Sequence, residues 1–501
     1  MDKIPEHRTQ NFKAKSAFAP EELRNRRNEL NVELRKQERE ESLLKRRNLA
    51  IAADSEDSED EAAPKISSQF YGQLPAMIQG VMSDNVEEQL DATTRFDMIL
   101  SQRSVLISKN FNPTIDEVIR CGVVPRFVEF LRSSHSAVRI RALSVLTSIA
   151  SGTSVQTQYL IDVGVVPLFI ELINSPVANG AISALGSIAG DGPLTRDIVL
   201  REQALTPLLG VFHEDCEASL LRTATWALLN FCGSKPPPDW ILISPALGVL
   251  AKLIHSSDNS VLVDVCMALS YLSLNSDKSG VKIEAVIQSG VCHRLVELLA
   301  HHTAPVQTSA LRTIGNIVAG DEFQTQAVIE CGALQALLVV LSSPKQRLRE
   351  LACWTISNIT AGSSRQINSV IEAKLIPPLI DILKNADFNT KKEACWAISN
   401  ATSKREQISQ RVNYLVSQGC IKPLCDTLIC TDNKIVQPAL NGLENILSVG
   451  EMEKEATNGV NQYSLCIDEC GGTEKIRRLQ THHNTANCET AYRIIDKYFS
   501  Q

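Results

Sequence analysis

The chain has few aromatic residues and no long apolar run, and both features narrow its class. Aromatic residues make up 5% of the 501 residues while 44% are hydrophobic, which favours aliphatic helix packing over a β-sandwich. No run of about 18 apolar residues is present that could span a bilayer. Residues 1–49 are densely charged and lack the apolar centre of a signal peptide. We therefore expect no membrane segment and no secretory route.

The chain also lacks a positive net charge, clustered cysteines and familiar catalytic motifs. Its net charge is −7, so the whole chain is no obvious nucleic-acid binder. The 14 cysteines are scattered, and the closest group (Cys420, Cys425 and Cys430) fits no usual zinc finger. Without a secretory signal, we expect reduced thiols in a cytosolic or nuclear protein. No P-loop, nucleophile elbow, zinc-protease or kinase signature occurs, so we expect no enzyme, cofactor or metal site.

What the chain does contain is an internal repeat. The letters GVVP at Gly122 recur at Gly164, 42 residues later, and Gly290 and Gly332 are separated by the same 42 residues. Each glycine follows a short helical pattern and precedes an apolar helix, which favours a turn where glycine adopts positive φ. A period of about 40–47 with two or three helices is typical of armadillo and HEAT repeats. The sequence therefore predicts an all-α, right-handed armadillo-repeat solenoid of about ten repeats with an extended concave surface.

The composition divides the chain into three predicted segments. Residues 1–51 form a basic helical segment, since residues 1–50 hold 13 Lys and Arg against 9 Asp and Glu. Residues 52–69 are acidic and rich in serine, which predicts a flexible linker. Residues 70–499 carry the repeats. A helix as polar as the first segment has no core of its own, so it needs a partner.

Two tryptophan–asparagine pairs are the most informative feature of the repeats. Trp354 with Asn358 and Trp396 with Asn400 are W-x-x-x-N pairs placed 42 residues apart. Residues i and i+4 share one helix face, so each helix offers an indole beside a carboxamide. The indole can pack on the alkyl stem of Lys or Arg and attract its charge, while the asparagine can bond an extended backbone. Stacked helices of this kind predict a ladder for an extended basic peptide.

Aligning the third helix of every repeat extends this ladder. In chain order, the aligned pairs are Thr94/Met98, Ser144/Ser148, Ser183/Ser187, Trp226/Asn230, Met267/Tyr271, Arg312/Asn316, Trp354/Asn358, Trp396/Asn400 and Asn441/Asn445. The acidic residues beside these pairs are Asp191, Asp264, Asp321 and Glu393. Carboxylates there would hydrogen-bond Lys or Arg side chains and would repel nucleic acid. A lone tryptophan is usually a core residue, but three at one register, each with asparagine four residues on, favour a groove.

These pairs, together with three longer motifs, resemble the importin α (karyopherin α) family. The motifs are NFCGSKPPP at 230–238, RTIGNIVAGD at 312–321 and KKEACWAISNAT at 391–402, and the resemblance runs from about Arg24 to Phe499. It implies an adapter of nuclear import that binds basic nuclear localisation signals in its groove and importin β through its N-terminal segment. It also implies that an export carrier and the Ran-GTP cycle are partners and that the protein shuttles between cytoplasm and nucleus. It implies no membrane partner and no direct nucleic-acid partner.

The resemblance assigns roles in the basic segment. Its importin-β-binding cations are Arg24, Arg26, Arg27, Arg35, Lys36, Arg39, Lys45, Arg46 and Arg47. The cluster Lys45-Arg46-Arg47 itself resembles a localisation signal, which implies that it folds back into the groove when importin β is absent. A tethered pseudo-ligand blocks a site through its high local concentration. Importin β would remove this competitor and so couple cargo loading to carrier loading.

The resemblance also assigns two peptide sites, which differ in how well they match the family. The minor site comprises Arg312, Asn316, Asp321, Trp354, Ser357, Asn358, Glu393, Trp396 and Asn400. The major site comprises Ser144, Ser148, Gly152, Thr157, Ser183, Ser187, Asp191, Trp226, Asn230, Asp264 and Tyr271. Four serines stand where the family has two Trp/Asn pairs. Because each lost stacking or backbone contact costs roughly 1–3 kcal/mol, we expect a weakened major site and binding mainly through repeats six to eight.

One alternative function stays open from the sequence. An armadillo scaffold that does not ferry cargo could use the groove for a dedicated protein partner, and the serines of the major site favour this reading. The basic segment argues against it, because a scaffold has no need of a carrier-binding and self-inhibiting helix.

Overall fold

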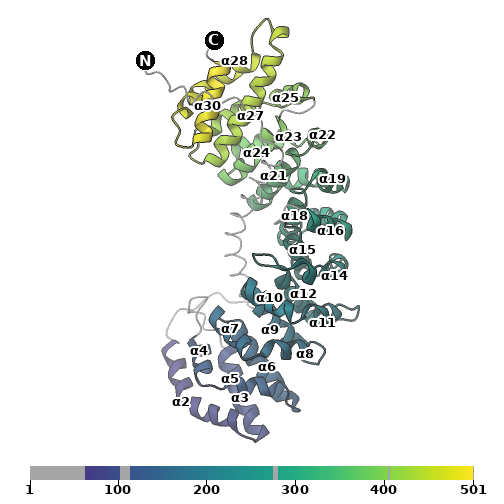
Figure 1. The fold of residues 1–501 in the computed structure, drawn as a ribbon, viewed down its shortest axis with the longest axis vertical. Helices are drawn as coiled ribbons and strands as arrows, with labels where there is room; N and C mark the ends of the chain where they lie inside the picture. Colours follow the sequence, from purple (N-terminus) through teal and green to yellow (C-terminus); the bar gives the residue numbers. More distant parts are fainter. Residues whose placement is uncertain (1–62, 102–112, 275–279, 404–406, 500–501) are drawn as a thin grey trace. The chain divides into compact units, whose positions relative to one another are not determined.

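The computed structural model describes residues 63–101, 113–274, 280–403 and 407–499, and every regular element in these ranges is a helix. The all-α prediction is therefore confirmed. The described residues form two compact units, residues 63–272 (the first unit) and residues 273–499 (the second unit), which are described separately (Figure 1). Within each unit, groups of up to three helices follow one another along the chain, as the 42-residue period predicts (Figure 1).

The first unit contains the helices up to α15. They are α2 (Ala63–Met82), α3 (Val86–Ser101), α4 (Pro113–Arg120), α5 (Val124–Phe130), α6 (Ser136–Ala150), α7 (Ser154–Asp162), α8 (Val165–Leu172), α9 (Ala178–Asp191), α10 (Pro193–Arg201), α11 (Leu205–Gly210), α12 (Ala218–Cys232), α13 (Trp240–Ile243), α14 (Ala246–Leu253) and α15 (Asn259–Leu272). Consecutive third helices, α3, α6, α9, α12 and α15, pack on one another.

The second unit continues the same order. It contains α16 (Val281–Gln288), α17 (Cys292–Glu297), η3 (Leu298–Ala300), α18 (Ala304–Ile317), α19 (Glu322–Glu330), α20 (Ala333–Leu341), α21 (Gln346–Thr360), α22 (Ser364–Glu372), α23 (Ile376–Asn385), α24 (Phe388–Ala401), α25 (Ile408–Ser417), α26 (Ile421–Thr427), α27 (Asn433–Met452), η4 (Lys454–Thr457), α28 (Gln462–Glu469), α29 (Gly472–Leu479) and α30 (Thr485–Tyr498). Here the stacked third helices are α18, α21, α24, α27 and α30.

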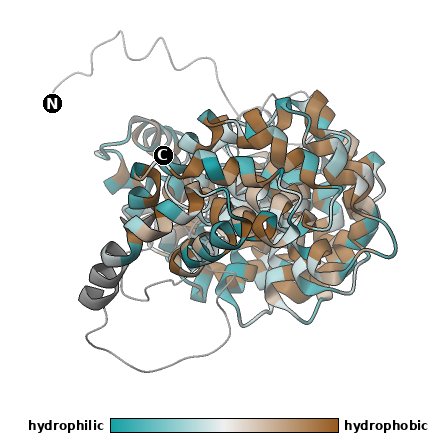
Figure 2. Ribbon diagram, turned by 90° about the horizontal axis from the view of Figure 1, so that it is seen from below, coloured by the Kyte–Doolittle hydropathy of each residue, from teal (hydrophilic) through white to brown (hydrophobic). Residues whose placement is uncertain are grey.

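Third helices carry the core of each repeat. In α21, 12 of 15 residues are buried, whereas only 3 of the 9 residues of the first helix α22 are buried. A third helix is covered on both sides by the third helices of its neighbours and by the second helix of its own repeat, so little of it remains for solvent. Figure 2 shows hydrophobic and hydrophilic residues alternating along single helices, as expected for elements with one buried face.

The turn between the first and second helices depends on glycine, as the sequence predicts. Gly164 and Gly332 precede α8 and α20 with φ of 79° and 85°, in the left-handed region. A side chain there would be strained, which explains why the glycines recur at the repeat period. The prediction of a positive-φ glycine at this turn is confirmed.

The first helices are linked to one another by a glutamine that the sequence analysis did not single out. In α19, Gln324 accepts a hydrogen bond from the Asp321 N–H at 3.1 Å and donates to the Gly280 carbonyl of the preceding repeat at 2.9 Å. Gln366 in α22 donates in the same way to the Glu322 carbonyl at 2.8 Å. The spacing of a capping residue followed three positions later by Gln is a capping box, and it could have been found in the sequence.

The start of the repeats differs from the predicted boundary. Helix α2 begins at Ala63, so residues 63–69 belong to a helix although their composition predicted the end of a linker at residue 69. Pro64 occupies the first turn, where a missing N–H costs nothing. Farther along α2, Met77 and Val81 are fully buried at the four-residue spacing of one helix face. The helical pattern therefore extends across the compositional boundary.

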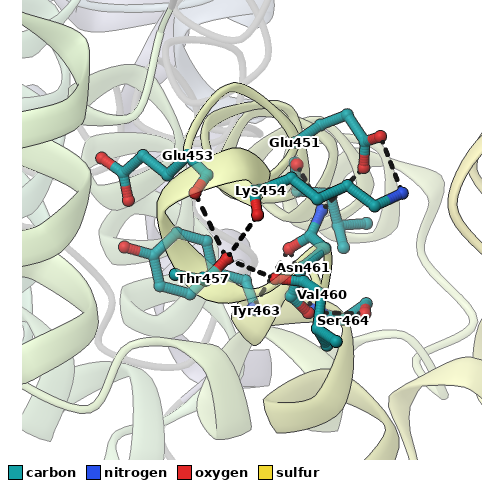
Figure 3. Close-up of polar contacts among 9 residues, drawn as sticks. Glu451, Glu453, Lys454, Thr457, Val460, Asn461, Tyr463 and Ser464 are labelled. Atoms are coloured by element: carbon teal, nitrogen blue, oxygen red, sulfur yellow. Dashed lines mark hydrogen bonds and ion pairs between the residues drawn. The ribbon is translucent and has the colours of Figure 1, made fainter.

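The last repeat is attached through the polar turn between α27 and α28, shown in Figure 3. Asn461 is buried and donates to the Leu447 carbonyl of α27 at 2.9 Å, while its side-chain oxygen accepts from the Tyr463 N–H at 3.2 Å. The Thr457 hydroxyl donates to the Val460 carbonyl at 2.6 Å. These bonds satisfy the backbone groups of the turn and fix where the first turn of α28 starts.

The cysteines and the apolar helices of the described residues were compared with what disulfides, metal sites and membrane spans require. All 14 cysteines are described, and all are free thiols, seven buried and seven half-buried. No group of three or more potential metal ligands occurs in the described ranges. No single described helix is both long and apolar enough to cross a membrane, although two sharply bent pairs of consecutive helices meet that test together.

Candidate peptide-binding surfaces

The nine predicted ladder pairs all lie on third helices. In chain order, their helices are α3, α6, α9, α12 and α15 in the first unit and α18, α21, α24 and α27 in the second. Each pair occupies the same register of its helix, so within a unit the stacked third helices present the pairs on one side. The major-site residues thus belong to the first unit, and the minor-site residues to the second.

A complete ladder position is built from two neighbouring third helices. Trp354 on α21 lies over Gly315 on α18 so closely that a Cβ on this glycine would lie 1.9 Å from the indole Cζ3. Asn358 donates its amide to the Gly315 carbonyl at 3.2 Å. The indole and the amide therefore hold the backbone of the preceding repeat, and Gly315 is required because only glycine leaves room for the ring.

The same arrangement recurs at two other positions. In the first unit, Trp226 lies over Gly186, where a Cβ would be 2.5 Å from the indole, and Asn230 donates to the Gly186 carbonyl at 3.0 Å. In the second unit, Asn400 donates to the Ser357 carbonyl at 2.9 Å. These asparagines were predicted to clamp a peptide with their side-chain amides. The structure shows that one amide hydrogen of each already bonds to the preceding helix.

Several polar atoms of this ladder are buried without a hydrogen-bond partner. Trp354 and Trp396 are 3% and 5% exposed, and within the described part of the chain their indole N–H groups have no acceptor. The side-chain oxygen of Asn230 and one carboxylate oxygen of Glu393 likewise lack a donor in those residues. Buried polar groups are rarely left unpaired, and the two indoles share one register on neighbouring helices, with Glu393 one turn before Trp396.

Glu393, the acidic residue predicted for the minor site, is in an unusual environment. It is 2% exposed, and burial raises the pKa of its carboxyl to about 7, with a further increase from Glu350 and a decrease from Lys392 and Arg347. Arg347 forms an ion pair with Glu350, with 3.0 Å between the guanidinium nitrogen and the carboxylate oxygen. A cation placed beside Glu393 would favour the ionised carboxylate and lower this pKa.

The other minor-site residues surround these groups. Asn316 is buried and Arg312 half-buried, both on α18. The buried Ser357 hydroxyl donates to the Trp354 carbonyl at 2.8 Å within α21. Asp321 is exposed and caps α19, because its carboxylate accepts from the Gln324 N–H at 2.9 Å. Asp321 therefore has a structural role that the sequence analysis did not anticipate.

The serine positions of the major site are occupied by bonds within the protein. Ser144 is half-buried, and its hydroxyl donates to the Asp97 carboxylate of α3 at 2.5 Å. Arg141 pairs with the other oxygen of Asp97 at 2.8 Å. Asp97 follows Thr94 by three residues, as Gly315 follows Arg312 in the second unit, so Asp97 and Gly315 occupy corresponding positions. A carboxylate bonded to Ser144 and Arg141 thus stands where glycine lies beneath the indole of Trp354.

Hydrogen bonds also connect the neighbouring hydroxyls and carboxylates of this site. The Ser151 and Ser187 hydroxyls are 3.1 Å apart, and Ser154 donates to the Asp191 carboxylate at 2.9 Å. Ser148 and Ser183 are half-buried, as are Asp264 and Tyr271 on α15. The first unit therefore presents small hydroxyl groups along α6 and α9, and among its ladder positions only Trp226 carries an indole.

Gly152 and Thr157, which the resemblance placed in the major site, have clear structural roles. A Cβ on Gly152 would lie 2.1 Å from the Gln156 side-chain oxygen, so the residue must be small to admit the capping box of α7. Thr157 is fully buried and donates to the Ala150 carbonyl at 3.3 Å. These bonds fix the turn that leads from α6 to α7, where Ser154 donates to Asp191 at the end of α9.

Comparison with known proteins places both parts of the chain in one family. Residues 8–94 match the importin beta binding domain. Residues 111–151, 282–319, 321–361 and 363–403 match the armadillo/beta-catenin-like repeat, and residues 461–501 match an atypical armadillo repeat. The crystal structure of an engineered protein matches with a TM-score of 0.74 at 24% identity, covering 84% of this chain and 97% of its own, which supports the fold.

Full-length relatives extend the match. Importin subunit alpha-1b of Oryza sativa subsp. japonica is 49% identical over 432 residues, which cover 85% of this chain and 79% of the relative. Importin subunit alpha-3 of Arabidopsis thaliana is 46% identical over 494 residues, covering 97% and 91% of the two chains. Importin subunit alpha-B of Dictyostelium discoideum is 48% identical over 496 residues, covering 98% and 93%.

Armadillo repeats preceded by an importin-β-binding segment define a nuclear import adapter, a protein that joins its cargo to importin β. On this combination and on its relatives, the chain belongs to the importin α family. The predicted importin-β-binding cations between Arg24 and Arg47 fall inside the matched domain but lie outside the described residues.

Proposed function

We propose that this adapter binds basic localisation signals in extended form chiefly through the second unit, with Trp354, Asn358, Trp396, Asn400 and Glu393 as the main contacts. The observation that carries the proposal is the set of buried, unpaired polar atoms at one register of α21 and α24, beside a carboxyl whose pKa is raised. A Lys or Arg chain can stack on the indoles and place its charge at Glu393. Arg312, Asn316, Ser357 and Asp321 complete this minor site.

The major site in the first unit binds more weakly in this proposal. Only Trp226 and Asn230 offer a complete ladder position there, while Ser144 donates to Asp97. Ser148, Ser183 and Ser187 add hydroxyls that cannot stack on a lysine stem. Asp191, Asp264 and Tyr271 remain as polar contacts, and Gly152 with Thr157 supports their backbone.

The basic segment regulates access to the second unit. Lys45, Arg46 and Arg47 act as a tethered competitor for the groove until importin β binds the segment between Arg24 and Arg47. The adapter shuttles between cytoplasm and nucleus, and an export carrier and the Ran-GTP cycle return and unload it. The motif KRR in the sequence and the importin-beta-binding match over residues 8–94 support this part of the proposal.

Calorimetry with a peptide that carries a single basic cluster tests the site assignment. The double variant W354A/W396A should weaken binding by about 10- to 100-fold, since each indole contributes about 1 kcal/mol or more. W226A should weaken it less than about threefold, because its ladder neighbours, Ser183 on α9 and Met267 on α15, carry no indole. If W226A abolishes binding while W354A/W396A leaves it intact, the second unit is not the main site.

A dedicated-partner scaffold is the second candidate, and the bonded serines of the first unit favour it. A pull-down with importin β separates the two functions. The transport adapter should capture importin β and release it when Ran-GTP is added. A scaffold that carries no cargo would show neither capture nor a Ran-GTP response.

A further inference from the structure

A cavity of about 320 Å³ lies among α23, α24, α26 and α27 of the second unit. Its walls are apolar where Leu383, Pro423 and Ile435 line it, and Phe388 at the start of α24 contributes a ring that is 41% exposed. The ladder residues are absent from this lining. The cavity is therefore separate from the peptide site proposed above.

The geometry of α24 explains this separation. Lys391 lines the cavity, whereas Glu393, two residues later, belongs to the minor site. Residues two apart on an α-helix are about 200° apart around its axis, so these side chains leave opposite faces. The cavity occupies the face where the end of α23 meets the start of α24, away from the groove.

Its charge is positive. Lys384, Lys391 and Lys422 line the cavity, and Asp426 is its only acidic lining residue. The Asp426 carboxylate is already bonded, to Lys422 at 2.6 Å and to Lys475 at 2.8 Å. Lys384 and Lys391 make no ion pair with any acidic group in the described ranges. Two ammonium groups thus stand beside an apolar hollow without a counter-charge.

We propose that this cavity is a docking site for a protein segment that presents a carboxylate next to an aromatic or large aliphatic side chain. The apolar side chain enters between Phe388, Pro423 and Ile435, and the carboxylate pairs with Lys384 and Lys391. Charge complementarity of this kind steers association and fixes the register of the bound segment. The partner chemistry is opposite to that of the basic signals in the groove, so one adapter molecule can hold both at once.

Fluorescence anisotropy on the full chain with a labelled hexapeptide, Asp-Glu-Phe-Asp-Glu-Leu, tests the proposal. The charge reversal K384E/K391E should weaken binding at least tenfold, and F388A, which leaves every charge in place, should weaken it at least threefold. K345E is the matched control, because Lys345 is an exposed lysine immediately before α21 in the preceding repeat. It should change binding less than twofold.

Two results would overturn the proposal. The acidic peptide could also bind the basic segment between Arg24 and Arg47, and binding that persists in K384E/K391E would belong there. A peptide with alanine in place of its phenylalanine and leucine that binds as well as the original would show that the apolar hollow is not used. Calorimetry of the same variants with a basic signal peptide should show unchanged affinity, which separates this site from the groove.

Discussion

The ladder positions of the two units show two different solutions to one packing problem. In the second unit, the residue beneath a ladder position is small, as at Gly315, and an indole lies over it while asparagine bonds its carbonyl. At Ser144 in the first unit, Asp97 takes the place of that glycine, and Ser144 donates to its carboxylate. Trp226 of the same unit lies over Gly186, as Trp354 lies over Gly315. The comparison teaches that a ladder residue and the residue beneath it on the preceding helix form one packing unit. Ser144 therefore differs from a tryptophan position both in its own side chain and in the residue that it contacts on the preceding helix.

The largest expected effect comes from filling the space beneath an indole. G315A places a methyl group 1.9 Å from the present position of Trp354 Cζ3 and forces the ring or the helix to move. We expect a loss of about 1–3 kcal/mol in unfolding free energy and weaker binding of a basic peptide. Urea unfolding followed by circular dichroism measures the unfolding free energy, and calorimetry measures the affinity for the basic peptide.

Gly248 in α14 of the first unit is the control for this substitution. A Cβ on Gly248 meets no atom within 4 Å, so G248A should be neutral or stabilise the protein by up to about 1 kcal/mol. Equal destabilisation by G248A and G315A would mean that the indole contact is unimportant.

The next effect is a gain in the first unit. The triple variant D97S/S144W/S148N, made in a W354A/W396A background, should raise affinity for a basic peptide about tenfold, since one stacked and clamped contact is restored. S144W alone should give no gain, because Asp97 occupies the space for the ring. Calorimetry decides between the two. A gain from S144W alone would contradict the coupling between neighbouring helices.

The pH dependence of peptide affinity in the second unit should be about as large as the gain expected from the triple variant. With the pKa of Glu393 raised to about 7 by burial, peptide binding requires loss of a proton at lower pH. Affinity for a lysine-containing peptide should therefore rise up to about tenfold between about pH 6 and 8, and E393Q should remove this rise. An E393Q variant with the same pH profile as the unmodified chain would exclude Glu393 as the titrating group.

Folding stability should change with pH in the opposite direction. The native Glu393 carboxyl holds its proton up to about pH 7, whereas its ordinary value is 4.5. The native state binds more protons than the unfolded state between these values, so this group lowers the unfolding free energy as pH rises through that window. Urea unfolding at pH 5 and pH 8 should show a smaller difference in E393Q.

The smallest effect is expected at a serine of the first unit. S148A removes a half-buried hydroxyl for which no described residue provides a hydrogen bond, so basic-peptide affinity should change less than about twofold. N358A is the matched substitution in the second unit. It leaves the Gly315 carbonyl without its donor and should weaken binding at least about fivefold.

Much of the architecture was readable from spacing, because armadillo helices obey a strict period. The 42-residue recurrence of glycine predicted the turns at Gly164 and Gly332, and the aligned pairs all fell on third helices. The start of α2 was missed, since composition changes at residue 69 while the helical pattern begins at Ala63. A linker and the polar first turns of a helix have similar charge and serine content. Only the packing of the helix distinguishes one from the other.

The linear pattern was sufficient for the repeat, the helices, the family and the positions of the Trp/Asn pairs, because each depends on residues close together in the chain. Contacts between repeats required the folded chain. The bonds from Asn358 to Gly315, from Ser144 to Asp97 and from Gln324 to Gly280 join residues 43 to 47 positions apart. The charged cavity beside Lys391 also required the folded chain, because its lining comes from four helices. Neighbouring repeats determine these sites, and a one-dimensional period cannot specify which side chains meet across them.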